Sequence, residues 1–199
     1  MPSILTADSW PLYLYLALVG LVAVQRLLEL RRSRNHEIAL KKRGGIEMAP
    51  GHFGAMRLLH VLWLVGCFLE SSWNGEPPDP TLSLAASLAF LIGQGLRFAA
   101  MRALRERWTV RIIALPGVFP VTHGVYRYMR HPNYLAVILE IASLPLIFGC
   151  WATALLASGA NALVLWIRIR AEEAALETLG DYETAFGSTR RFLPSPTSK

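Results

Sequence analysis

Four long runs of apolar residues constrain this chain of 199 residues more than any other feature. The runs are Trp10–Gln25, Leu58–Leu69, Leu82–Leu96 and Leu135–Ile167. The first and third carry no charged side chain, the second is apolar except for His60, and the last contains one charge, at Glu140. A helix of about 18 residues is about 27 Å long, which is close to the thickness of a bilayer core. The runs therefore predict an all-α, polytopic membrane protein, because they are too many for the core of one small soluble bundle.

The positive charges are gathered between these runs. All 20 Lys and Arg residues fall in the three segments Arg26–Arg57, Arg97–Arg130 and Arg168–Lys199. Since the cytoplasmic flanks of membrane helices collect Lys and Arg, all three segments are expected on the cytoplasmic side. That arrangement needs about five transmembrane helices, with the N-terminus outside and the C-terminus cytoplasmic. The predicted crossings are Trp10–Leu28, Met56–Trp73, Thr81–Ala99, Asn133–Gly149 and Trp151–Ile167. The last two are short and are expected to form a tight helical hairpin.

The formal net charge of +6 follows from this asymmetry and from contact with anionic membrane lipids. Nucleic-acid binding is not favoured, because no stacking aromatic residues interleave with a soluble basic face. Cys67 and Cys150 are isolated in predicted helices, so neither a disulfide framework nor a metal site is predicted. The chain is expected to form one membrane-embedded domain over residues 1–199, with no signal for an oligomeric state.

The second basic segment extends the third crossing outward. Phe98, Met101, Leu104 and Trp108 fall near one helical face, which predicts an interfacial helix with Trp108 at the level of the headgroups. The sequence LPGVFPVTHG that follows contains two prolines and two glycines, so it cannot form a regular helix. It is interpreted as a shaped loop, and such loops often serve ligands.

The stretch YRYMRHPNYLAVILE leads into the fourth crossing. Pro132 suits the first turn of a helix, so the helix is expected to begin between His131 and Asn133. Arg130 and His131 then stand beside free backbone N–H groups and the positive end of the helix dipole. This arrangement indicates a site for an anionic group such as a carboxylate, or else a contact of Arg130 with lipid phosphate and a simple capping role for His131.

The sequence RIRAEEAALETLGDYETAFG continues the fifth crossing. Arg168 and Glu172 lie four residues apart on one helical face, which is compatible with an ordinary exposed ion pair. The predicted hairpin, however, brings both residues to the membrane face that carries His131. With tyrosines nearby in the sequence, such a set could hold a small zwitterion. These tyrosines are Tyr126, Tyr134 and Tyr182.

The elements GVYRYMRHPNYLA and RIRAEEAALETLGDYETAF, separated by an apolar hairpin, resemble the isoprenylcysteine carboxyl methyltransferase and phospholipid methyltransferase group. The resemblance covers about residues 115–194, the expected donor-binding and catalytic region. The N-terminal half, from RLLELRRSRNHEIALKKRGGIE to His60, is similar to a bacterial branch whose members include methyltransferases of long-chain phenolic or pyrone lipids. A multi-pass protein of the bacterial cell membrane is the implied localisation.

The resemblance implies S-adenosylmethionine as the methyl donor, bound without a Rossmann domain. The chain agrees, because it has no strand followed by GxGxxG. Arg168 would face a lipophilic or prenylated methyl acceptor, and the loop Val118–Val121 would line the adenine. Ala136 stands where the family often has glycine and is expected to narrow the donor pocket. The implied donor-binding residues are Val118, Phe119, Pro120, Val121, Tyr126, His131, Pro132, Asn133, Tyr134 and Glu172.

Glu140 lies about two turns, roughly 10 Å, inside the fourth predicted helix, and His60 enters the second at a comparable depth. An ionisable group at such a depth is a functional candidate. A carboxylate acceptor needs no base, whereas a phenol with a pKa near 10 would benefit from one. We hypothesise that Glu140, with His60, takes the proton of the acceptor. The alternative is that the two side chains bond to each other or to the helix backbone.

Two other function classes compete with a methyltransferase. Membrane sterol-type reductases contain a similar RHPNY element and use NADPH, so nucleotide binding discriminates between the two enzymes. A non-catalytic membrane scaffold or a small transporter would bind neither nucleotide. The sequence does not divide into two structural halves, which disfavours the transporter.

Overall fold

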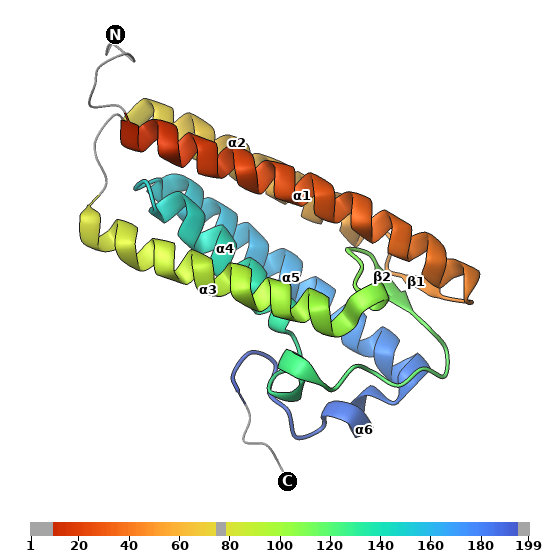
Figure 1. The fold of residues 1–199 in the computed structure, drawn as a ribbon. Coiled ribbons are helices and arrows are strands. Elements are labelled where there is room, and N and C mark those ends of the chain that lie inside the picture. The colour runs from red at the N-terminus through yellow and green to blue at the C-terminus, as the bar shows by residue number, and fades with distance from the viewer. Residues whose placement is uncertain (1–9, 75–78, 195–199) are drawn as a thin grey trace.

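The computed structural model describes residues 10–74 and 79–194, and this part of the chain is dominated by five long helices (Figure 1). They are α1 (Trp10–Lys42), α2 (His52–Asn74), α3 (Pro80–Leu104), α4 (Pro132–Leu146) and α5 (Trp151–Gly180). The short elements are β1 (Ile46–Met48), η2 (Arg105–Arg107), β2 (Ile112–Ala114), η3 (Gly124–Arg127) and α6 (Tyr182–Phe186). The predicted all-α class is confirmed.

Within residues 10–74 and 79–194, four helices are long and apolar enough to cross a membrane, whereas α4 has only 15 residues. Their outward faces are apolar; Leu21, Leu91 and Leu156, for example, are 65%, 63% and 75% exposed. In water such surfaces would be a liability, but lipid solvates them. The chain is therefore a multi-pass membrane protein. The last two crossings were both predicted to be short, and this is right for α4 with its 15 residues but wrong for α5, which has 30.

The helices α1, α3 and α5 run in one direction, and α2 and α4 run in the other (Figure 1). The described parts of the three basic segments consequently gather toward one end of the bundle, where α1, α3 and α5 finish. We call this end the basic end. The expectation that the basic segments share one end is confirmed, and the assignment of that end to the cytoplasm stays a prediction.

Close packing between α3 and α4 depends on Gly93. A Cβ atom at this position would lie 3.1 Å from the Cβ of Leu139, 3.2 Å from the Cγ of Glu140 and 3.3 Å from the carbonyl oxygen of Ala136. Ala136 itself is fully buried in this contact. The expectation that its methyl group narrows a ligand pocket is wrong, because Ala136 does not line the cavity described below.

The predicted hairpin of the last two helices is confirmed. Gly149 adopts a φ of +68° at the corner, and the N–H of Cys150 donates to the carbonyl of Pro145 at 2.9 Å. Inside the bundle, Trp63 of α2 is buried and its indole Nε1 donates to the carbonyl of Ile141 in α4 at 3.1 Å. These contacts fix α4 between its neighbours, so the residues of α4 hold defined positions.

A two-stranded antiparallel sheet closes the basic end. Ile46 of β1 pairs with Ala114 of β2, which ties the loop after α1 to the loop after α3. Glu47 in β1 accepts hydrogen bonds from Lys41, at 2.6 Å, and from Arg111. These two cations hold the pKa of the Glu47 carboxyl below its usual range, the hydrogen bond from Lys41 being the larger cause.

Candidate functional site

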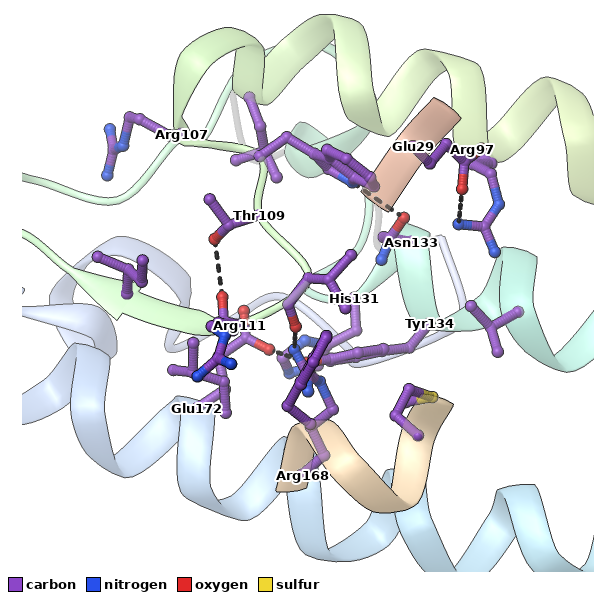
Figure 2. Close-up of a pocket in the computed structure, with 18 of the residues that line it drawn as sticks. Glu29, Arg97, Arg107, Thr109, Arg111, His131, Asn133, Tyr134, Arg168 and Glu172 are labelled. Carbon is purple, nitrogen blue, oxygen red and sulfur yellow. Dashed lines mark hydrogen bonds and ion pairs between the residues drawn. The ribbon is translucent and has the colours of Figure 1, made fainter. Parts of the chain in front are cut away.

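A cavity of about 490 Å³ lies at the basic end, and all five long helices contribute to its wall. The segment from Trp108 to Val121 completes the wall. This volume is in the range typical of small-molecule sites. Figure 2 shows that His131, Tyr134 and Arg168 converge on one region of the cavity, although His131 directly precedes α4, Tyr134 lies in α4 and Arg168 lies in α5.

Tyr134 joins the two residues that the sequence paired directly. Its hydroxyl donates to the carboxylate of Glu172 and accepts a hydrogen bond from Nε of Arg168 at 2.9 Å. Arg168 also donates through Nη2 to the carbonyl of Val110. A direct Arg168–Glu172 ion pair does not occur among the described residues, so the alternative of an ordinary exposed pair is wrong. We refer to His131, Tyr134, Arg168 and Glu172 as the Tyr134 cluster.

His131 directly precedes α4 as predicted, but its side chain contacts Glu173, the residue after Glu172. Its Nε2 lies 3.0 Å from Oε1 of Glu173. The same oxygen accepts a hydrogen bond from Nε of Arg191 at 2.9 Å, and Oε2 of Glu173 accepts one from Nη2 of Arg191 at 2.6 Å. The backbone N–H of His131 donates to the carbonyl of Arg191 at 3.0 Å. The chain after α6 therefore occupies a backbone donor that the sequence had assigned to an anionic ligand.

Arg130 is likewise engaged by this segment. Its Nε donates to the carbonyl of Thr189, and its guanidinium lies 5.9 Å from the centre of the Tyr182 ring. Arg130 still lines the cavity, and its anion-binding role stays a prediction. Burial raises the pKa of the Tyr126 and Tyr182 hydroxyls, and both groups therefore remain O–H donors across the physiological range.

The loop between β2 and η3 has the irregular form that its prolines and glycines predict. Val118, Pro120 and Val121 line the cavity, whereas Phe119 is 51% exposed and does not. The carbonyl of Phe119 instead accepts two hydrogen bonds from Arg107, both 3.1 Å long. Three of the four loop residues predicted to contact the adenine therefore line the cavity, and the contact with adenine itself stays a prediction.

The sequence also predicted the positions of Asn133, Trp108 and Pro132. Asn133 lines the cavity, and its Oδ1 accepts a hydrogen bond of 3.4 Å from Nε1 of Trp108. Trp108 is only 3% exposed, so its side chain is buried in the protein, and its place at the headgroup level stays a prediction. Pro132 begins α4 as expected, but it is fully buried and does not line the cavity.

A second group of charges lies deeper in the bundle, and we call it the Arg97 cluster: Arg26, Glu29, Arg97 and Glu140. Nε of Arg97 is 2.8 and 3.1 Å from the two oxygens of Glu140, and Nη2 is 2.6 Å from Oε2. Arg97 also contacts Glu29 at 3.3 Å, a pair visible in Figure 2. Two cations and two carboxylates compensate each other in a setting where an isolated charge would be costly.

In the structure Glu140 is held in an ion pair, unlike a carboxylate that is free to accept a proton from a substrate. Both of its oxygens are held by Arg97, and Glu140 does not line the cavity. The catalytic role of Glu140 stays a prediction, and these contacts favour a positioning role. His60 does line the cavity, and its Nδ1 lies 2.8 Å from the carbonyl of Met56 in its own helix. His60 therefore bonds to the helix backbone through one ring nitrogen only, and its role as a base stays a prediction.

The sequence reasoning missed three members of the Arg97 cluster. Arg26, Glu29 and Arg97 were counted only as members of the basic segments, yet all three line the cavity. The sequence did indicate that such a cluster exists, because Glu140 inside an apolar helix needs a compensating cation. The partner could not be chosen without the arrangement of the helices.

The fold and the cavity define an integral membrane protein with an internal polar site that extends among its helices. The model of the isoprenylcysteine carboxyl methyltransferase (ICMT) family matches residues 85–178. The uncharacterized protein YpbQ of Bacillus subtilis is 37% identical over 161 residues, covering 80% of this chain and 95% of its own. An uncharacterized protein of Haemophilus influenzae is 31% identical over 156 residues, covering 77% and 90% respectively. The chain belongs to the ICMT family, which makes it a membrane methyltransferase.

Proposed function

We propose that this protein transfers a methyl group from S-adenosylmethionine to an oxygen of a lipophilic acceptor. One observation carries the proposal: a single cavity joins the Tyr134 cluster at the basic end to an apolar arm between α1 and α2. A polar nucleoside and a lipid could therefore meet inside the bundle without either crossing the membrane.

The residues at the basic end fit the proposed donor. The carboxylate of Glu172 and the tyrosine rings suit a cationic centre, and Arg130 suits a carboxylate. Val118 and Val121 offer an apolar wall for an adenine ring. When bound, S-adenosylmethionine supplies a methyl group on a positively charged sulfur. The residues of this chain would hold and orient it, which is the main requirement of an in-line displacement.

The acceptor would enter from the bilayer. Leu27, Val61 and Val65 line the cavity, yet they are 66%, 51% and 46% exposed on the outside of the bundle. Residues that face both lipid and cavity mark a lateral opening between α1 and α2. An acceptor with a long apolar chain, such as an isoprenylcysteine-type carboxylate or a phenolic or pyrone lipid, suits this route.

His60 is the proposed proton acceptor for a phenolic substrate. A carbonyl oxygen can only accept, so the proton of the His60 ring lies on Nδ1 and the lone pair lies on Nε2. His60 takes the O–H proton, the oxygen forms a bond to the methyl carbon, and the methyl–sulfur bond breaks with its electron pair staying on sulfur. The proton then passes from His60 to water. A carboxylate acceptor is already ionised and needs no such step.

Calorimetry with S-adenosylhomocysteine tests the donor assignment on purified protein in lipid nanodiscs. Saturable binding supports the proposal, whereas heat on adding NADPH alone would support a reductase instead. Incubating the protein with a bacterial lipid extract and radiolabelled S-adenosylmethionine then identifies the acceptor from the labelled lipid.

The variant His60→Asn tests the proton step. Turnover of a long-chain alkylresorcinol should fall by about 10²–10⁴-fold, the usual contribution of a general base. Turnover of N-acetyl-S-farnesylcysteine, a carboxylate, should change little. Equal losses with both acceptors would assign His60 a structural role.

A further inference from the structure

Arg26 differs from the other buried arginines in how its guanidinium is used. Its Nη1 lies 3.0 Å from Glu29 and 3.6 Å from Glu140. Its Nε and Nη2 are shielded from solvent, and no described residue accepts a hydrogen bond from either. The side chain is only 11% exposed, and it lines the cavity at the membrane arm.

The neighbouring Arg97 shows what these two nitrogens can do. Arg97 uses its own Nε and Nη2 as a fork that grips both oxygens of Glu140. The same edge of Arg26 is open, although buried guanidinium donors normally have partners and are costly without them. The side-chain oxygen of Gln94 accepts a hydrogen bond from Gln25. The amide Nε2 of Gln94 is buried and has no partner among the described residues, so it joins Nε and Nη2 of Arg26 as a third unpaired donor. The region therefore has more donors than acceptors.

Arg168, which the family resemblance assigns to the acceptor, has less bonding capacity left. Its Nε is bound to Tyr134 and its Nη2 to the carbonyl of Val110, so its fork is already filled by the protein. Of the two arginines, Arg26 is the one whose Nε and Nη2 have no partner among the described residues, and it lies beside the apolar arm. This arm is lined by Ala23, Leu27, Val61, Leu64 and Val65.

We infer that Arg26 is a specificity-determining residue that binds an acidic oxygen group of the lipophilic acceptor. This inference rests on the proposed function. The apolar chain of the ligand lies in the arm between α1 and α2, and its oxyanion supplies the missing acceptors to Nε and Nη2 of Arg26. Glu29, Arg97 and Glu140 act as a scaffold that keeps the fork of Arg26 at the cavity wall.

The test compares Arg26→Gln and Arg26→Lys with the wild-type chain in nanodiscs. The acceptor probes are N-acetyl-S-farnesylcysteine and a long-chain alkylresorcinol, and the kinetics use whichever probe the wild type methylates. Loss of charge-assisted hydrogen bonds should raise the acceptor KM of Arg26→Gln about tenfold to a hundredfold. The affinity for S-adenosylhomocysteine, measured by calorimetry, should stay within about twofold. Lysine keeps the charge but lacks the fork, so Arg26→Lys should show an intermediate KM.

Arg31→Gln, at an exposed arginine on the same helix, is the matched control and should behave as wild type. An acceptor KM within twofold of wild type in Arg26→Gln would overturn the inference. So would equal losses of acceptor and S-adenosylhomocysteine binding, because they indicate a general structural defect. A wild-type protein that neither binds S-adenosylhomocysteine nor methylates either probe would overturn the proposed function itself.

Discussion

The Tyr134 cluster and the Arg97 cluster border the same cavity, yet they are built in different ways. The Tyr134 cluster combines side chains with backbone carbonyls, since Arg168 donates to Val110 as well as to Tyr134. The Arg97 cluster balances charge with charge from three helices, in a part of the bundle surrounded by lipid-facing leucines. Charged groups near the basic end can therefore bond to carbonyls of the loops, whereas the charged groups deeper in the bundle compensate one another.

The largest expected effect lies in the Arg97 cluster. Glu140→Gln leaves the guanidinium of Arg97 without its main counter-ion, and breaking a buried pair from one side costs about 3–5 kcal/mol. Thermal unfolding in detergent should show a large loss of stability. The double variant Arg97→Met with Glu140→Leu removes both charges and should recover most of it. If Glu140→Gln instead keeps its stability and loses only turnover of a phenolic lipid, Glu140 is the base and the positioning role is refuted.

A smaller effect, on binding, is expected in the Tyr134 cluster. Tyr134→Phe removes the hydroxyl that joins Arg168 to Glu172, so both charged groups lose an ordered partner. Affinity for S-adenosylhomocysteine should fall about tenfold, in line with one charge-assisted hydrogen bond. Calorimetry measures this, and Tyr128→Phe, at a tyrosine outside the cavity lining, is the control. Unchanged affinity would separate this cluster from the donor site.

The smallest expected effect concerns the sheet that closes the basic end. The pKa of Glu47 is lowered in the folded protein, so its contribution to stability is fully present above the ordinary carboxyl range. That contribution should be lost as the pH falls through the lowered pKa of the folded state. Melting temperatures between about pH 7 and pH 3 should therefore decline less steeply in Glu47→Gln than in the wild type. Parallel curves would show that Glu47 does not stabilise the closed sheet.

Much of the Tyr134 cluster could be predicted because its residues lie in two short motifs on consecutive helices. Gly149 and the apolar runs predicted the hairpin, and the hairpin brought His131 near Arg168 and Glu172. The pairing inside the cluster could not be predicted. Neighbouring residues on a helix point about 100° apart, so Glu172 and Glu173 face different partners, and the rotation of α5 decides which one meets His131.

The sequence by itself determined the helices and their membrane character, because hydrophobicity and helix length are local properties of a segment. It also determined that the basic segments share one end and that the two family motifs flank the hairpin of α4 and α5. Only the tertiary structure decided that Arg97 compensates Glu140 and that Arg26 keeps an open fork beside the cavity. The physical reason is that charge compensation in a membrane depends on distances between helices, and these distances follow from packing contacts such as the one at Gly93.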